Sequence, residues 1–378
     1  MTAEAPWACV GTDWAAALAA APREWFVPDV AWTTGDGLLD RQADPQGWWA
    51  AIARDDAIVT QIDDGRTELT DDSPWTTLDW TSSCSAPNMV FDFLRLLDPY
   101  PGDRVLEVGT GTGWTAALLS ARLGAEWVTS IDIDASVAAA ARARLECAEF
   151  TPTLLVGDGA EGHPAGAPFD RVHVTCGVSE IPPAWVEQTR PGGVIVLPWM
   201  PFHSGGYKVR LVVADDERAV GRIHGTAAYM PMRAQRLPRT SAGSEATRSR
   251  SRIDPRRIDA GGDGFRIAVL GLLGGVTNRG GGTNPVDGTF RYVLIDGISD
   301  SHAIAIQPPS GGPAEVRQRG PRRLWDELES AYLQWVGWGE PSVDRLGVTV
   351  NRAGQHVWLD SPNNPLTEVP HGRRRQAP

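Results

Sequence analysis

The sequence predicts an α/β protein built around a doubly wound, mostly parallel sheet. Three observations support this fold class. Short apolar strands alternate with helical segments over residues 76–236, one strand runs into a turn with glycines at 109, 111 and 113, and the next strand ends in Asp132. Alternation favours parallel strands, because each connection between parallel neighbours needs a crossover, usually a helix. Glycine turns and acidic strand ends are also typical of folds that bind nucleosides.

Residues 1–75 are expected to form an N-terminal segment of helices and a hairpin. Apolar spacing favours helices over 14–21 and 48–54 and a strand over 57–62, closed by turn residues 63–65. Residues 76–236 form the predicted sheet domain. Its expected order is a strand to 108, a helix over 115–123, a strand over 127–131, a helix over 136–147, strands over 153–156 and 171–175, a helix near 185, a strand over 194–197, and an antiparallel hairpin of 207–214 with 219–223.

Composition changes after this hairpin. Residues 237–263 contain few apolar residues and an RSRSR run, which predicts a mobile basic linker. Residues 264–378 are expected to form a smaller α+β module. Its predicted elements are strands over 265–270, 292–295 and 303–306, a helix over 323–335, and a hairpin of 346–350 with 355–359. The glycines at 280–282 lack the lysine of a phosphate loop and are interpreted as a flexible connection.

The first glycine motif favours S-adenosylmethionine over a pyrophosphate cofactor. Its G-x-G-x-G spacing departs from the dinucleotide fingerprint, and Glu107 would repel a pyrophosphate but attract an ammonium or a sulfonium. Asp132 lies at the distance expected for a ribose contact, and Asp158 follows another strand and could meet the adenine amino group. Such turns also build sheets that bind no nucleoside, but their order and spacing favour a cofactor site. The expected cofactor-binding residues are Glu107, Gly109, Thr110, Gly111, Thr112, Gly113, Asp132, Ile133, Gly157, Asp158 and Gly159.

Charge and cysteine content narrow the partners. The net charge of −12 disfavours nucleic acid, since a phosphate backbone would be repelled. Four cysteines without C-x-x-C spacing suggest neither a zinc site nor a disulfide framework, so no metal and a reducing cytoplasm are expected. No basic leader with an apolar core and no apolar run of about 18 residues is present, so no membrane association is expected.

Several separated motifs resemble the protein-L-isoaspartate O-methyltransferase family. They are PREWFVP (22–28), SSCSAPNM (82–89), DRVLEVGTGTG (103–113), GDG (157–159), APFDR (167–171) and IPP (181–183). The resemblance covers roughly residues 20–236 and implies a Rossmann-like class I S-adenosylmethionine-dependent methyltransferase that yields S-adenosylhomocysteine. It also implies that Ser85, which precedes Ala-Pro, contacts the substrate carboxylate; serine at this place could equally cap the helix that begins at Pro87.

Other residues are expected at the peptide groove. Ser83 and Cys84 stand where the family has threonine and isoleucine, and Asn88 stands where it has histidine or tyrosine, which puts the repair specificity in doubt. Residues Thr175, Cys176, Gly177 and Val178 follow the fourth strand, where parallel folds place ligands. Cys84 and Cys176 also suit small buried side chains. No catalytic base is expected, because an aspartyl carboxylate with a reference pKa near 4 is already ionised at neutral pH.

Further fragments are more similar to an actinobacterial branch found beside ribosomally made peptides, the graspetides and lanthipeptides. They are IVTQIDDG (58–65), PW (198–199) and MRAQR (232–236), together with the C-terminal module. This resemblance implies esterification of an aspartate in a modified, macrocyclic precursor peptide, leading to aspartimide and then isoaspartate. A repair enzyme for L-isoaspartate and a catalytically inactive peptide-binding module are the rival interpretations. The C-terminal module, which contains the aromatic helix 324–338 and is attached through the linker, is expected to engage substrate, with a plain structural extension as the alternative; the sequence leaves the oligomeric state open.

Overall fold

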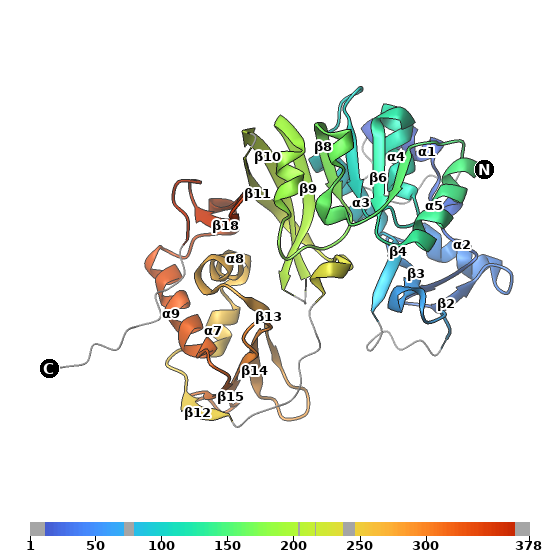
Figure 1. Ribbon diagram of the computed structural model, residues 1–378. Coiled ribbons are helices and arrows are strands. Elements are labelled where there is room, and N and C mark those ends of the chain that lie inside the picture. Colours follow the sequence, from blue (N-terminus) through green and yellow to red (C-terminus); the bar gives the residue numbers. More distant parts are fainter. Residues whose placement is uncertain (1–11, 72–78, 203–204, 216, 237–245, 367–378) are drawn as a thin grey trace.

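The computed structural model describes residues 12–71, 79–202, 205–215, 217–236 and 246–366. Three sheets organise these residues: a central nine-stranded sheet, a four-stranded N-terminal sheet and a five-stranded C-terminal sheet (Figure 1). The central sheet has the order β18-β17-β11-β10-β9-β8-β5-β6-β7. The predicted doubly wound Rossmann-like fold with a smaller C-terminal α+β part is confirmed.

The parallel half of the central sheet holds the predicted strands. They are β5 (Val105–Val108), β6 (Val128–Asp132), β7 (Thr153–Val156), β8 (Phe169–Val174) and β9 (Thr189–Phe202). Neighbouring residues of a strand point to opposite faces. On β5, Val105 packs in a core with α3 (Pro87–Leu97) and α4 (Trp114–Leu123), whereas Leu106 packs in another core with α6 (Pro183–Glu187). Helices therefore cover both faces, and α5 (Ala135–Cys147) packs beside β6 and β7.

The antiparallel half of the sheet extends into the C-terminal part of the chain. After β10 (Gly205–Asp215) and β11 (Arg218–Ala227), the next strand in space is β17 (Leu346–Asn351), followed by β18 (Gly354–Leu359). Strand β17 pairs with β11 from Arg218↔Asn351 to Arg222↔Gly347. The predicted final hairpin is present, but it belongs to the central sheet, so the expectation of a module over 264–378 separate from that sheet is corrected. Continuous apolar packing joins both parts.

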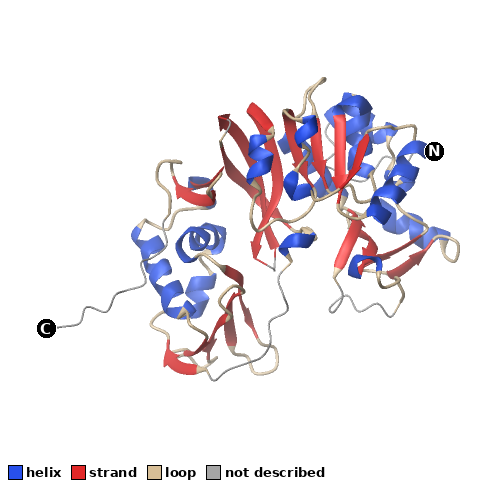
Figure 2. Cartoon of the chain, in the orientation of Figure 1, coloured by secondary structure: helices blue, strands red, loops and turns tan. Residues whose placement is uncertain are grey.

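The remaining C-terminal elements form a sheet with helices on one face (Figure 2). The strand order is β12-β16-β15-β14-β13. The elements are β12 (Thr247–Arg250), α7 (Pro255–Asp259), α8 (Gly262–Leu273), β13 (Val276–Thr283), β14 (Phe290–Asp296), β15 (Ser301–Gln307), β16 (Glu315–Arg319) and α9 (Leu324–Gly337). Short 3₁₀ turns elsewhere are η3 (Ala125–Trp127), η4 (Gly159–Glu161), η5 (Pro164–Gly166), η6 (Arg233–Gln235) and η7 (Val343–Arg345).

Three expectations for this region are wrong. The predicted strand over 265–270 is part of helix α8, because Phe265, Ile267 and Ala268 are buried together with its other apolar residues and the run lacks a readable period. The glycines at 280–282 lie within β13 rather than in a flexible connection. The expected linker contains β12 and α7, while its residues 237–245 lie outside the described part of the chain.

The N-terminal segment forms the four-stranded antiparallel sheet β2-β1-β3-β4 with helices beside it. Its elements are α1 (Thr12–Ala20), η1 (Arg23–Trp25), β1 (Val30–Thr33), β2 (Gly37–Asp40), α2 (Pro45–Ala53), β3 (Ile58–Ile62), η2 (Asp63–Gly65) and β4 (Trp80–Cys84). Helix α1 packs on α4, which ties this segment to the central sheet. In the described part of the chain, every helix is too short or too polar to cross a membrane.

Arg23 holds the N-terminal segment against the strand that precedes Ser85. Its side chain is only 1% exposed, and its guanidinium donates to the carbonyl oxygens of residues 52, 54, 56, 84 and 85 at 2.7–3.2 Å. A buried guanidinium is tolerated only when its donors are satisfied. These hydrogen bonds to five carbonyl groups explain the presence of an arginine in the PREWFVP motif.

Replacing Arg23 should destabilise the whole protein. Arg23→Met leaves several buried carbonyl groups without donors, which we expect to cost about 3–5 kcal/mol of the free energy of unfolding and about 5 °C of the thermal midpoint. Differential scanning calorimetry measures both. Arg257→Met, an exposed arginine on α7, is the control and should leave the midpoint in place. An unchanged midpoint in Arg23→Met would contradict this account of the arginine.

Candidate active site

A cavity of about 370 Å³ lies at the carboxyl ends of the parallel strands. Its floor consists of residues that directly follow β5, β6 and β8, among them Gly109, Ile133 and Thr175. Its other walls come from strand β4 and from residues 229–236. Open α/β sheets bind ligands at this edge, and the volume is in the range of small-molecule sites.

The glycine turn shapes the floor. Gly109, Gly111 and Gly113 have φ values of 99°, 53° and 90°, a region that side chains other than glycine rarely adopt. A Cβ at Gly109 would lie 2.4 Å from the Thr175 hydroxyl, so a side chain there has no space. The turn therefore brings bare backbone to the cavity, and the Gly111 N–H donates to the Asp132 carboxylate at 3.0 Å.

Acidic groups surround the floor. Asp132 also accepts from the Asp134 N–H at 2.9 Å, and burial raises the pKa of its carboxyl. Asp158 accepts from the Ala160 N–H at 2.9 Å and lines the same cavity. Two carboxylates beside bare backbone fit a ligand with hydroxyl groups and positive charge, and do not fit a pyrophosphate.

Glu107 lies behind this floor rather than on it. It is fully buried, its Oε2 accepts from Ser130 at 2.5 Å, and the Ser130 and Thr110 hydroxyls lie 2.6 Å apart. Its Oε1 has no hydrogen-bond partner among the described residues. Burial raises the pKa of Glu107 to about 8, although the hydrogen bond from Ser130 opposes the shift. Beside it on β8, burial lowers the pKa of His173 to about 3, which keeps that ring neutral.

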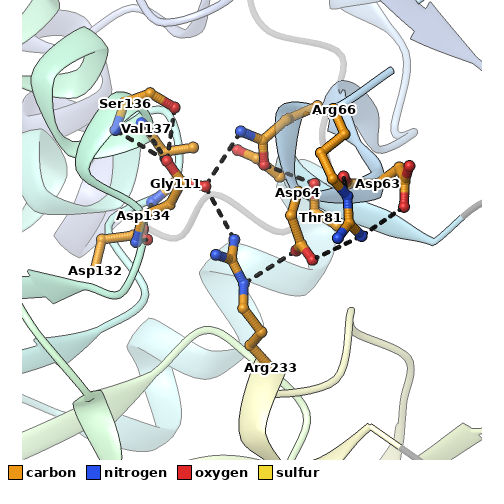
Figure 3. Close-up of polar contacts among 12 residues, drawn as sticks. Asp63, Asp64, Arg66, Thr81, Gly111, Asp132, Asp134, Ser136, Val137 and Arg233 are labelled. Atoms are coloured by element: carbon orange, nitrogen blue, oxygen red, sulfur yellow. Dashed lines mark hydrogen bonds and ion pairs between the residues drawn. The ribbon is translucent and has the colours of Figure 1, made fainter. Parts of the chain in front are cut away.

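An ionic network holds Arg233 and Arg236, which line one wall of the cavity (Figure 3). Arg233 contacts Asp64 and Asp134, with nitrogen–oxygen distances of 3.0 Å to each, and Arg236 donates to Asp64 at 2.9 Å. Partial burial of Asp134 is outweighed by hydrogen bonds from Ser136 and Arg233, so the pKa of its carboxyl lies well below the usual range. The network joins three segments: turn η2, the loop after β6, and η6.

Ser85 and Tyr229 form the wall between this cavity and a second groove. Both residues line the cavity and the adjoining groove of about 460 Å³. Ser85 does not cap α3, because the N-cap is Ala86 and no side chain caps that helix. The pair stands where a peptide in the groove would meet a ligand in the cavity.

The structure brings most of the expected site residues together. Those that line the cavity are Ser83, Ser85, Gly109, Thr110, Gly111, Thr112, Asp132, Ile133, Asp158, Gly159, Thr175 and Cys176. Those that do not are Cys84, Asn88, Glu107, Gly113, Gly157, Gly177 and Val178. Asn88 is held by Asp55, with its N–H 2.8 Å from the carboxylate, and Cys84 is buried. Burial raises the pKa of the Cys176 thiol to about 12, so it is no nucleophile at neutral pH.

The loop after β8 is fixed from two distant places. Gln235 accepts from the Ser179 N–H at 2.7 Å, and Gln355 on β18 accepts from the Ile181 N–H at 2.8 Å and donates to the Ser179 carbonyl at 2.7 Å. Sequence reasoning missed Gln355, Tyr229 and Arg233. Arg233 and Gln235 lie in the MRAQR fragment, which by itself indicates only the resemblance to the peptide-modifying branch. No local pattern points to Gln355 or Tyr229 as site residues.

Comparisons with known proteins agree with this geometry. The sequence model of the protein-L-isoaspartate(D-aspartate) O-methyltransferases matches residues 63–236. The protein-L-isoaspartate O-methyltransferase of Thermococcus onnurineus is 34% identical over 150 residues, 39% of this chain and 68% of that protein. The chain belongs to this family. The enzyme of Pyrococcus horikoshii is 36% identical over 149 residues, 39% of this chain and 67% of that protein, so the chain spans about two thirds of these relatives.

The family fixes the coarse assignment predicted from the sequence: an S-adenosylmethionine-dependent protein carboxyl methyltransferase. A solved protein-L-isoaspartate O-methyltransferase superposes with a TM-score of 0.51 and 21% identity, covering 93% of this chain and 96% of that one, which shows a shared fold. The cavity residues fit the cofactor: the floor glycines, Asp132 and Asp158 would hold it, with Glu107 behind them. Assignment to the peptide-modifying branch is a separate proposal.

The buried Glu107 should make stability depend on pH. Its folded pKa of about 8 lies above the ordinary 4.5, so the folded state retains a proton that the unfolded state loses. The resulting stabilisation is complete below about pH 4.5 and disappears as the pH rises to about 8. In cofactor-free protein, the thermal midpoint of wild type relative to Glu107→Gln should therefore fall steadily from pH 5 to pH 8. A constant difference across this range would show that Glu107 does not titrate there.

Proposed function

We propose that this chain esterifies the side-chain carboxylate of an aspartate in a ribosomally made, modified precursor peptide, and that the ester closes to an aspartimide. The observation that carries the proposal is the Ser85–Tyr229 pair between the cofactor cavity and an adjoining groove. A peptide carboxylate in the groove would lie beside the cavity at this pair. Ser83, which stands where the family has threonine, lines both the cavity and the groove and supports a substrate other than the repair substrate.

The residues of the site orient and shield the carboxylate. S-adenosylmethionine, when bound, supplies a methyl group activated by sulfonium. The hydroxyls of Ser85 and Tyr229, which line both the cavity and the groove, can each donate a hydrogen bond to the carboxylate. No base is needed, since the carboxyl is already ionised at neutral pH. Alignment and exclusion of water account for about 7–11 kcal/mol in well-oriented reactions, and Asp64 and Asp134 hold Arg233 at the wall of the cavity.

Methylation gives the carboxyl group a methoxy leaving group, which departs as methanol, whereas a free carboxylate would have to expel oxide. The amide nitrogen of the next peptide unit can then attack the ester carbonyl, lose its proton and expel methanol, which closes the five-membered imide. This step needs no further group from the protein. Water can open the imide to isoaspartate.

Repair of L-isoaspartate is the second candidate function. The relatives named above are protein-L-isoaspartate O-methyltransferases, and the same pair of hydroxyls could orient an isoaspartyl carboxylate. The two candidates differ in the backbone on either side of the carboxylate. A third interpretation, an inactive peptide-binding module, is opposed by the complete glycine turn and by Asp132 in the cavity.

A paired substrate assay separates these functions. Candidate precursor peptides, linear and macrocyclic, and a short L-isoaspartyl peptide are incubated with protein and S-adenosylmethionine, and products are identified by mass spectrometry. We expect a methyl ester and then a dehydrated imide on a precursor aspartate. Methylation of the isoaspartyl peptide alone would instead establish the repair function, and failure to bind S-adenosylmethionine by calorimetry would establish the inactive module.

Removing the two hydroxyls should reduce turnover without weakening cofactor binding. A hydrogen bond to a charged group is worth about 1.5–3 kcal/mol, so Ser85→Ala should lower kcat/KM by about 10–100-fold. Tyr229→Phe removes the neighbour and should cost about 2–10-fold. Because both hydroxyls would contact the same carboxylate, the double variant should lose less than the product of the single losses. Strictly multiplicative losses would contradict the pair, and calorimetry checks that the cofactor dissociation constant is unchanged.

A further inference from the structure

A continuous series of hollows leads from Ser85 to the C-terminal sheet. The groove beside the cofactor cavity is lined by Ser85, Met89 and Ala228. A second hollow of about 610 Å³ is lined by the same Met89 and Ala228 and by Gly280 and Val293. The two hollows thus share two residues, and the second ends on strands β13 and β14 of the C-terminal sheet.

Two glycines on strand β13 expose bare backbone at the end of this path. Neither Gly280 nor Gly282 has a positive φ, and a Cβ at either position would meet no described atom within 4 Å. Gly281 differs, because a Cβ there would lie 2.5 Å from the Phe290 ring. Neither backbone conformation nor packing therefore requires glycine at 280 or 282, although glycine inside a strand is destabilising. Glycine inside a strand is typical of places where another backbone approaches closely.

The strand register places these glycines in two rows on the face of the sheet opposite the helices. One row runs Gly280, Val293, Ile304, Arg317 and Arg248, and the next runs Gly282, Arg291, Ile306, Glu315 and Arg250. The intervening residues of these strands, such as Tyr292, Leu294 and Val316, are buried under the helices. The first row therefore changes from bare backbone to two apolar residues and then to two arginines. The second row has Arg291 beside the glycine and Glu315 between Ile306 and Arg250.

Charge on this face opposes the charge of the whole chain. The two rows contain four arginines and one glutamate, in a chain of net charge −12. The side chains of Arg248 and Arg317 are 73% and 43% exposed, and both share the single carboxylate of Glu315. An acidic peptide would be repelled by the rest of the molecule and attracted here.

We infer that these two rows, which we term the arginine face, bind an extended segment of the substrate peptide that flanks the methylated aspartate and carries alternating apolar and acidic side chains. This inference rests on the proposed function, since it requires a peptide at Ser85. Apolar side chains would contact Val293, Ile304 and Ile306, while acidic ones reach Arg317 and Arg248. The bare strand at Gly280 and Gly282 admits the peptide backbone between the groove and this face.

Helix α9 does not provide this surface. Trp325 and Trp335 are buried, and α9 packs against β14, β15 and β16. The buried aromatic residues of α9 form part of the core that supports the sheet, and the opposite face of the sheet carries the exposed charge.

The test measures peptide binding directly. The probe is a fluorescein-labelled peptide in which Asp-Gly is followed by alternating glutamate and valine, and anisotropy gives its dissociation constant with the full-length protein. The variant Gly280→Val/Gly282→Val adds side chains only where space is free, and valine favours strands, so the fold should persist. We expect about tenfold weaker binding from this variant and from Arg248→Glu/Arg317→Glu. Calorimetry should show an unchanged dissociation constant for S-adenosylmethionine.

Matched controls lie away from the arginine face. Arg257→Glu reverses an exposed charge on α7, and Gly337→Ala fills open space at the end of α9; both should bind the probe like wild type. The inference is overturned if the two arginine-face variants also bind like wild type, or if a lysine-valine probe or a single-stranded oligonucleotide binds as tightly. Because the assay measures binding without turnover, failure of methylation alone would refute the proposed function while the binding result still decides the role of this face.

Discussion

The position of Ser85 depends on a buried guanidinium. Arg23 donates hydrogen bonds to backbone carbonyls in α2, in the loop before β3 and at residues 84 and 85. These bonds connect the N-terminal segment to the residues beside the cavity. A buried charge of this kind is stable only with nearly all donors in use, which leaves the surrounding backbone little freedom. Ser85 is thereby presented to Tyr229 with its main chain already fixed.

From this point the site is assembled by residues that are distant in sequence. Asp64 on turn η2, Asp134 after β6 and Arg233 on η6 meet at the wall of the cavity, and glutamines 235 and 355 hold the loop after β8. Each contact is of ordinary strength, but every one joins a different pair of segments. These ion pairs and hydrogen bonds build the walls of the cavity from both the sheet domain and the N-terminal segment. The floor of the cavity comes from the sheet alone.

The floor could be predicted from sequence and the walls could not, for a physical reason. The glycine turn, Asp132 and Asp158 follow buried strands directly, and strand ends in a parallel sheet converge whatever the rest of the chain does. Local apolar patterns also located β7 and the final hairpin. They failed for α8, where a helix buried on several sides reads as a continuous apolar run. Tyr229 and Gln355 have no local signature, because their roles come from partners far along the chain.

The pairing of β17 with β11 makes the C-terminal sheet an insertion between two adjacent strands of the central sheet. The chain on both sides of the C-terminal sheet therefore belongs to the central sheet, whereas a domain joined by a single linker can change its orientation. The distance between Ser85 and the arginine face is consequently constant. A substrate peptide would be selected by the number of residues that separate its aspartate from its acidic flanking segment.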